Sequence, residues 1–458
     1  MRMRSFPSEA SFSKPFAAYV LILVLNAAPA WALNGPQLIG FSAESTALAG
    51  AGHVAVADTS AMNTNPAALS LIKDFRFDFT GGFLKPDIRY SDNFNDNARG
   101  PNNPFALGNI GIAKRLTSVP GLTVGAGIFT QGGFGTDYRN VTTPFGTTDQ
   151  ASSFLRYFKI AIGMSYDVTD KITIGVAPSL GYSDVSLRVF PGTSVPPGAG
   201  LPTGFAGFNI RDTCSRNGGL GPLGENCPSD WVIGAKIGAM YRALSWLTVG
   251  VTYTPPIRFN YSNGQSTINF SAFGLGQVNY SSTQVADFRW PQQVDVSMAA
   301  RPTDRLMLAL TTSWINWGQI NTVNISASNP SNPLAPSVVN LSLPLNWKDQ
   351  AVVAAGVSYV AWRDDSLTDK ERLVLRAGYN YGNNPVPSNT LTPLVAVILE
   401  HHLSGGLGFR FNDHWSYDFA ALNAFKNTQT STSTTSPFGN AKSSVAGYYI
   451  YNTFSYRF

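Results

Sequence analysis

The chain has 458 residues, of which 44% are hydrophobic and only 13% are charged, and its net charge is +5. A soluble domain carries about 25% charged residues, so this composition is not typical of one. The first 32 residues hold three cations and one acid, and without them the net charge is about +3. That charge is too small and too dispersed to indicate a nucleic acid or an anionic lipid as a partner.

Residues 1–32 predict a secretory signal peptide. Arg2, Arg4 and Lys14 precede an apolar run, "FAAYVLILVLNAA", and an Ala-x-Ala sequence ends at Ala32. This order of charges, apolar run and small residues is typical of a cleaved leader. The run is too short to cross a bilayer as a helix. We therefore expect an exported mature protein that begins near residue 33.

The mature chain predicts a transmembrane β-barrel. It has no window near the roughly 18 uninterrupted apolar residues that a spanning helix requires. Its 43 glycines and 29 prolines fit turns and bent strands better than helices. In a barrel, lipid-facing residues alternate with lumen-facing ones, so each strand gives only a weak hydropathy signal.

The last ten residues alternate strictly between two faces. Ile450, Asn452, Phe454, Tyr456 and Phe458 share the face that would meet lipid. A terminal Phe that closes such a strand resembles the C-terminal signature of bacterial outer-membrane proteins. We therefore expect an integral protein of the bacterial outer membrane, surrounded by outer-membrane lipid.

The alternation divides the chain into about fourteen strands of an all-β, antiparallel transmembrane barrel. The expected strands lie near residues 74–84, 107–116, 121–131, 153–168, 171–190, 230–243, 246–260, 284–301, 305–320, 346–363, 371–382, 400–411, 414–426 and 444–458. Short and long connections alternate between them, as turns and external loops do in outer-membrane barrels. The long loops include 191–229, 261–283, 321–345 and 383–399, and both termini would face the periplasm.

Residues 33–73 precede the first expected strand and contain small residues throughout. No apolar stripe there is wide enough to form a core of its own, so another part of the chain must pack around it. The stretch "SAESTALAGAGHVAVADTSAMNTNPAAL" and the later blocks "RPTDRLMLALTTSWINW", "WKDQAVVAAGVSYV" and "LRAGYNYGNNPVP" resemble the long-chain fatty acid outer-membrane transporters of the FadL/TodX type. The resemblance implies that residues 33–73 are a hatch inside a fourteen-stranded barrel, residues 74–458.

The resemblance also marks two features of the site. Asn65, Pro66 and Ala67 match the hatch motif, in which Pro66 fixes its own backbone and makes a rigid turn. The family's third strand bends inward and opens a gap through which ligand leaves sideways into the membrane. Glycines permit such a bend, and this strand contains Gly125, Gly127, Gly132 and Gly133.

Five cations face the lumen when the alternation is projected along the strands: Lys159, Lys236, Arg289, Arg376 and Arg410. Facing lipid at mid-bilayer, each would cost about 2 to 4 kcal/mol. A fatty-acid carboxylate that leaves water needs a cation or several donors. The ligand-binding candidates are therefore Lys236 and Arg376, ahead of Lys159. The alternative is that these cations are solvated in the lumen or paired with acids there.

The two cysteines, Cys214 and Cys227, lie in the longest loop, and an oxidising compartment could link them. Two thiols without a nearby histidine are too few ligands for zinc. We expect a disulfide and no metal or other cofactor. The spacing of the four histidines suggests no Ser-His-acid set.

The sequence predicts a monomeric, non-enzymatic barrel that takes up hydrophobic compounds without energy input. A plugged lumen fits a carrier of hydrophobic ligands better than an open porin. Long-chain fatty acids, which the resemblance implies, are the main candidate, with release past a movable plug into the membrane. The alternative is uptake of aromatic or aliphatic hydrocarbons by the same barrel. A structural barrel and an outer-membrane lipase are weaker alternatives.

Overall fold

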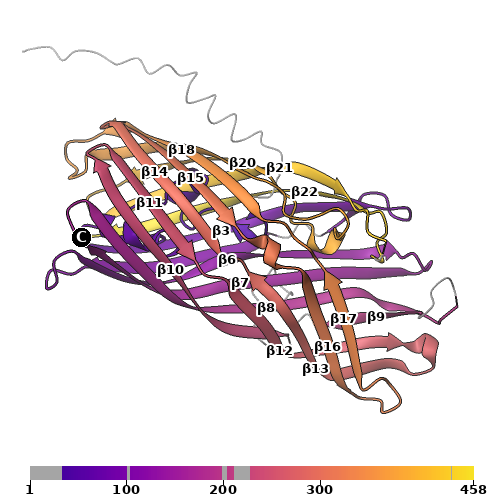
Figure 1. Ribbon diagram of the computed structural model, residues 1–458. Coiled ribbons are helices and arrows are strands. Elements are labelled where there is room, and N and C mark those ends of the chain that lie inside the picture. Colours follow the sequence, from indigo (N-terminus) through magenta and orange to yellow (C-terminus); the bar gives the residue numbers. More distant parts are fainter. Residues whose placement is uncertain (1–32, 101–103, 199–203, 211–226, 435) are drawn as a thin grey trace, which may run out of the picture.

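The computed structural model describes residues 33–100, 104–198, 204–210, 227–434 and 436–458, which form one sheet of 22 strands. Figure 1 shows long strands that run obliquely around the molecule, as the strands of a closed barrel do. Fourteen of them close an antiparallel ring in which each strand pairs with the next and the last with the first: β3 (Phe75–Ser91), β5 (Phe105–Arg115), β6 (Leu122–Thr142), β7 (Thr148–Asp167), β8 (Ile172–Val195), β10 (Ser229–Leu244), β11 (Leu247–Thr254), β14 (Gln293–Thr303), β15 (Leu306–Ile315), β18 (Gln350–Arg363), β19 (Glu371–Gly382), β20 (His401–Arg410), β21 (Trp415–Thr430) and β22 (Lys442–Arg457).

An extension of the sheet continues beyond part of this ring. It contains β9 (Phe205–Ile210), β12 (Ile257–Phe270), β13 (Gly276–Trp290), β16 (Thr322–Pro330) and β17 (Val338–Pro344). They pair in the order β8, β9, β12, β13, β16, β17. Figure 1 shows the labels of β9, β13, β16 and β17 at the end of the molecule opposite the C-terminus.

The prediction of about fourteen strands is wrong for the sheet as a whole. Residues 261–283 and 321–345, expected as loops, contain most of β12, β13, β16 and β17. The expected strand 246–260 is split between β11 and β12 at Pro255 and Pro256. Proline cannot donate to the hydrogen-bond ladder, so the chain leaves one pairing and enters another at this point.

The wall alternates between a lipid face and a lumen face. In β22, Tyr449 and Tyr451 are fully buried, whereas Phe454 on the opposite face is 50% exposed. These are the faces that the alternation predicts. The ring of the terminal Phe458 lies 5.6 Å from that of Phe75, so it covers the seam between the last strand and the first. Among the described residues, no helix is both long and apolar enough to cross a membrane.

Residues 33–73, which we call the N-terminal segment, lie inside the ring. Their backbone carbonyls accept hydrogen bonds from side chains on three separated wall strands. Asn109 of β5 donates to Phe41, Ser404 of β20 donates to Ala47, and Thr311 of β15 donates to Ala51, at 2.7, 2.8 and 3.1 Å. The wall therefore supplies hydrogen-bond donors that the short helices of this segment cannot supply for their own carbonyls. The elements of the N-terminal segment are β1 (Leu33–Asn34), β2 (Gln37–Leu38), α2 (Ala43–Ala47), α3 (Ala61–Thr64) and η1 (Pro66–Leu71). The other short elements of the chain are β4 (Ala98–Arg99), η2 (Ser271–Phe273), η3 (Trp317–Gln319) and η4 (Pro393–Val395).

Candidate functional site

Asn65, Pro66 and Ala67 form a buried turn against the inner wall. Asn65 is extended, and its Oδ1 accepts a hydrogen bond from the Ala67 N–H at 3.1 Å before Pro66 begins η1. A Cβ on Gly238 of β10 would lie 2.0 Å from Asn65 Oδ1. A Cβ on Gly175 of β8 would lie 2.3 Å from the Ala67 nitrogen. The turn therefore fits the wall because glycine stands at both positions.

The wall opens between β5 and β6. Their pairing ends at Asn109 and Phe129, although β6 continues to Thr142. Beyond this point β6 pairs with β2, where Gln37 lies opposite Gly132. The strand thus leaves its neighbour in the wall and turns toward the N-terminal segment.

Glycines at the bend allow this change of partner. Gly132 and Gly133 have φ values of +150° and +152°, and the register between β6 and β7 shifts immediately before Gly132. A Cβ on Gly132 would lie 2.0 Å from the carbonyl oxygen of Pro36, so the close approach needs glycine. The bend is therefore centred on Gly132 and Gly133, while Gly125 and Gly127 lie in the paired part of β6.

A cavity of about 470 Å³, which we call the gap cavity, lies at this opening. Leu155 and Tyr157 line it from the buried lumen face of β7, and Ile128, which is 44% exposed, lines it from the lipid face of β6. The cavity thus reaches through the wall. Its other lining residues are Leu33, Leu38, Leu84, Phe105, Ala106, Leu107, Gly108, Thr130, Gly132, Gly133, Phe134, Gly135, Phe154, Arg156 and Phe158.

A second cavity of about 80 Å³, the lumen cavity, adjoins the first because Phe134, Phe154 and Leu155 line both. All the residues that line the lumen cavity are uncharged. The remaining ones are Ser153, Val185, Ser186, Leu187, Ile210, Tyr261, Val285, Phe288, Val323, Ile325, Leu343, Leu345, Trp347 and Val395. The two cavities together offer a largely apolar surface from the lumen to the opening in the wall.

Residues 383–399, expected as an external loop, fold into the lumen instead. The hydroxyl of Tyr138 on β6 donates to the Pro393 carbonyl at 3.4 Å. Ser153 on β7 donates to the Leu394 carbonyl. The apolar run "LTPLVAVIL" in this segment is the sequence signal for an inward fold, because exposed loops are normally polar.

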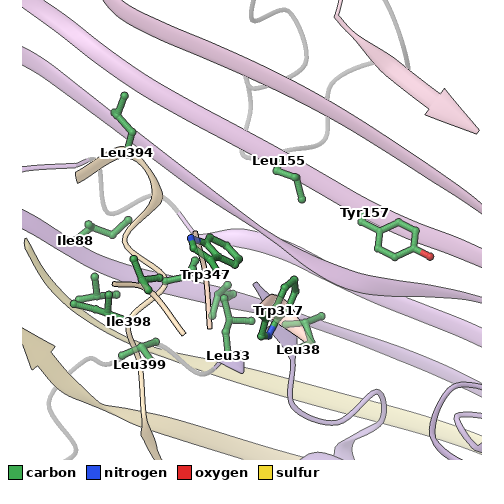
Figure 2. Close-up of a cluster of buried hydrophobic side chains, with 14 of the residues drawn as sticks. Leu33, Leu38, Ile88, Leu155, Tyr157, Trp317, Trp347, Leu394, Ile398 and Leu399 are labelled. Carbon is green, nitrogen blue, oxygen red and sulfur yellow. The ribbon is translucent and has the colours of Figure 1, made fainter. Parts of the chain in front are cut away.

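A row of aromatic rings connects the two cavities. The ring of Tyr157, in the gap cavity, lies 4.7 Å from that of Trp290. Trp290 and Trp317 follow at 5.7 Å, and Trp317 and Trp347, in the lumen cavity, at 5.5 Å. All three contacts are edge-to-face, a favourable geometry for ring quadrupoles. Figure 2 shows Tyr157, Trp317 and Trp347 in the same buried cluster as Leu33 and Leu38.

Lys236, a predicted ligand contact, faces the lumen but is paired with a wall acid. Its Nζ lies 3.6 Å from Asp295 Oδ2, and Thr252 donates to the same carboxylate at 2.6 Å. His53 of the N-terminal segment lies 3.9 Å from Asp295. Burial lowers the pKa of His53 to about 4, so its ring is neutral at neutral pH and does not compete with Lys236 for the Asp295 carboxylate. Lys236 is not among the described residues that line the two cavities.

Arg376, the second candidate, lies in a different compartment. It lines a chamber of about 390 Å³ at the C-terminal end of the barrel, which we call the polar chamber. Its guanidinium is 3.0 Å from Glu44 of α2 and 2.8 Å from Asp418 of β21. Arg376 therefore ties the N-terminal segment to the wall. Arg410 also faces this chamber, as the alternation predicts, and is paired with Asp369.

Lys159, ranked third, lines neither apolar cavity, although its neighbours Tyr157 and Phe158 line the gap cavity. It is 6% exposed on the lumen face of β7, where Tyr157 precedes it by one inward position. Among the described residues, no carboxylate forms an ion pair with its ammonium group.

Arg289 is the cation whose predicted face is wrong. Its neighbours Phe288 and Trp290 are buried on the lumen side, and Arg289 lies opposite the exposed Arg258. The pairing of β12 with β13 contains several register shifts, and Asp287 has a φ of +69°. Each such irregularity moves the following side chains to the other face.

Arg156 is the one charged residue among the described residues that line the two cavities. Its Nε donates to Asp184 Oδ1 at 3.2 Å, and its Nη2 donates to Oδ2. Asp184 is fully buried and also accepts from the hydroxyl of Tyr182 at 3.0 Å. Neither charged residue was expected at a site, because their pairing depends on the register of β7 with β8.

The predicted disulfide cannot be placed in full. Cys227 is fully buried, and Cys214 lies outside the described residues. No free cysteine is present in the described part of the chain. The bond between them stays a prediction.

The model of one protein family, described as "Outer membrane protein transport protein (OMPP1/FadL/TodX)", matches residues 23–458. The chain belongs to this family. The resemblance found in its sequence motifs is thereby confirmed, and so is its character as an outer-membrane transport protein rather than an enzyme.

Solved structures show the same fold as this FadL/TodX-family chain. The toluene transporter TodX of P. putida has 19% sequence identity and a TM-score of 0.72, over 92% of this chain and 99% of that one. The toluene transporter TbuX of Ralstonia pickettii has 20% identity and a TM-score of 0.67, again over 92% and 99%. A Pseudomonas aeruginosa FadL homologue has 14% identity and a TM-score of 0.67, over 94% and 99%.

A curated relative shares a shorter stretch with the chain. It is a Chlorobium limicola protein described as "Uncharacterized protein in phosphoenolpyruvate carboxykinase gene 5'region" and is 35% identical over 79 residues. The match covers 17% of this chain and 39% of that protein.

Proposed function

We propose that the protein is a passive outer-membrane channel for small, neutral hydrophobic compounds, with aromatic hydrocarbons as the first candidates. Ligand enters at the end opposite the C-terminus and is held in the lumen and gap cavities. It then leaves between β5 and β6 into the membrane.

One observation carries this proposal: the two adjoining cavities are lined by apolar and aromatic side chains, and the guanidinium of Arg156 is already bound by Asp184. A neutral ring needs no counter-ion when it leaves water, whereas a carboxylate does. The row from Tyr157 to Trp347 offers rings for edge-to-face contacts. The names of TodX and TbuX, both described as toluene transporters, support the same ligand class.

We further propose that the domain division expected from the sequence applies: a leader, residues 1–32, a hatch, residues 33–73, and a barrel, residues 74–458. The pairing of Glu44 with Arg376 and the fit of Asn65 to Gly238 support a hatch that separates the apolar cavities from the polar chamber. A hydrophobic ligand above such a hatch would find its exit in the wall rather than through the polar chamber.

Uptake of two labelled compounds tests the proposal. Cells that lack a transporter of this type would be given radiolabelled toluene or oleate with and without the protein, and initial rates would be measured. We expect saturable toluene uptake that depends on the protein and oleate uptake at the background rate. Saturable oleate uptake with toluene at background would overturn the proposal.

Fatty-acid uptake is the second candidate function, and Lys159 favours it. This ammonium is buried on the lumen face of β7, one inward position after Tyr157 of the gap cavity, and has no ion-pair partner among the described residues, so it could meet a carboxylate. In that case Lys159→Met should weaken fatty-acid binding by about 1.5 to 3 kcal/mol, the range for charged hydrogen bonds, and leave toluene uptake unchanged. Lys114→Met, at an exposed position of β5, is the matched control.

A further inference from the structure

The ion pair of Arg156 and Asp184 lies where the gap cavity meets the outer face of the wall. Arg156 is directly opposite Gly133 of the bend on one side and Asp184 of β8 on the other. Phe154 and Phe158, which precede and follow it on the same face of β7, line the gap cavity as well. A ligand that passes from the cavity through the opening therefore meets Arg156.

We propose that Arg156, held in place by Asp184, determines which ligands pass the opening. Its guanidinium binds the face of an aromatic ring, while Asp184 occupies the donors with which it would capture a carboxylate. The inference rests on the function proposed above and adds a residue that discriminates aromatic from aliphatic and from anionic compounds.

The geometry of the pair supports this division of roles. An arginine recognises a carboxylate through two parallel N–H donors, and Asp184 already accepts from Nε and from Nη2. The planar face of a guanidinium remains able to stack on a ring in that state, because stacking and edge donation use different directions. Cation–π contacts strengthen where water is excluded, and the side chain of Arg156 is only 15% exposed.

A contribution to folding stability is a poor explanation for the ion pair of Arg156 and Asp184. Asp184 has no exposed surface, and burying two charges costs desolvation that their attraction offsets only in part. Residues of similar size without charge could hold β7 against β8 equally well. A purely structural pair would, in addition, have no effect on the choice among ligands that all reach the cavity.

The first test removes the carboxylate that accepts from Nε and Nη2 of Arg156. In Asp184→Asn, this pair of donors can bind a carboxylate of the ligand instead, so benzoate should inhibit toluene uptake, which it should not do in the unaltered protein. Asp287→Asn is the matched control, because Asp287 pairs with Arg258 at 2.5 Å between β12 and β13, and neither residue is among those that line the two cavities. Benzoate inhibition that is absent from Asp184→Asn, or equal in both variants, would overturn the proposal.

The second test removes both charges and decides the question if the single variant fails to fold. In Arg156→Gln/Asp184→Asn, the ratio of toluene to octane uptake should fall about two- to fivefold, the effect of losing one cation–π contact. Heat-modifiable migration on gels would show that the barrel is intact. An unchanged ratio in an intact barrel would contradict the role of Arg156, whereas absence of toluene uptake by the unaltered protein would overturn the proposed function itself.

Discussion

At the scale of single residues, the inner wall is shaped by the absence of side chains. Glycines on β7 and β5 accept the N-terminal segment as those on β10 and β8 do. A Cβ on Gly163 would lie 2.4 Å from Met62 Cγ, and one on Gly111 would lie 2.5 Å from Thr59 Oγ1. Glycine in a strand costs conformational entropy, and the van der Waals contacts with the packed N-terminal segment offset that cost.

A single methyl group at the turn should therefore loosen the N-terminal segment. In Gly238→Ala the new Cβ would fall 2.0 Å from Asn65 Oδ1, and overpacking of this kind costs about 1 to 3 kcal/mol. We expect residues 33–73 to become sensitive to limited proteolysis while the barrel keeps its heat-modifiable migration.

Gly405→Ala is the control for this prediction. Its Cβ would meet only the Arg376 carbonyl oxygen, at 3.8 Å, which is an ordinary contact. Equal protease sensitivity in the two variants, or none in Gly238→Ala, would mean that the glycine fit does not hold the segment.

Several site residues could not be assigned from the sequence because their partners lie far away along the chain. The alternation placed Lys236 and Arg376 in the lumen correctly, but Asp295 and Glu44, which bind them, are not neighbours in sequence. Their availability to a ligand could be judged only from the folded chain. Arg289 was misplaced for a different reason, because bulges invert the alternation locally.

At the scale of elements, β6 connects the wall, the cavities and the N-terminal segment. Its first half pairs with β5, and its bend pairs with β2 through Gly132. The Gly133 amide donates to the Pro36 carbonyl at 2.9 Å. The opening in the wall is therefore built by the same hydrogen bonds that fix the start of the N-terminal segment.

Gly133→Ala should disturb the opening and reduce uptake. The added Cβ would lie 2.1 Å from the Leu155 carbonyl oxygen, and the φ of +152° is one that alanine rarely adopts. We expect the strand to shift and initial toluene uptake to fall severalfold with the barrel intact. Gly146→Ala tests backbone strain alone, since Gly146 has a φ of +76° and open space around it. Similar losses in both variants would argue against a specific role of the bend.

The ring strands were the part of the fold that the alternation predicted well, because each has one lipid face and one lumen face. The bend was expected from the resemblance to the FadL/TodX family, and the glycines of this strand permit it. The extension strands β12, β13, β16 and β17 were not, since prolines lie at their ends and they are rich in polar residues, as external loops are. The inward fold of residues 383–399 required knowing that an apolar lumen was there to receive it.

At the scale of the whole molecule, the N-terminal segment lies between two unlike compartments. The lumen and gap cavities are apolar, while the polar chamber is lined by acids and cations, including Arg76, Asp369 and Arg410. A hydrophobic compound would lose its favourable surroundings on entering the polar chamber. The proposed route between β5 and β6 would keep it in contact with apolar surface until it reached lipid.

A crystal structure of the protein soaked with bromobenzene tests this account most directly, because bromine scatters anomalously and marks the ligand. We predict bromine peaks in the lumen cavity beside Phe288 and in the gap cavity between Tyr157 and Ile128. Peaks confined to the polar chamber, or an occupied lumen with none at the opening between β5 and β6, would contradict the proposed route.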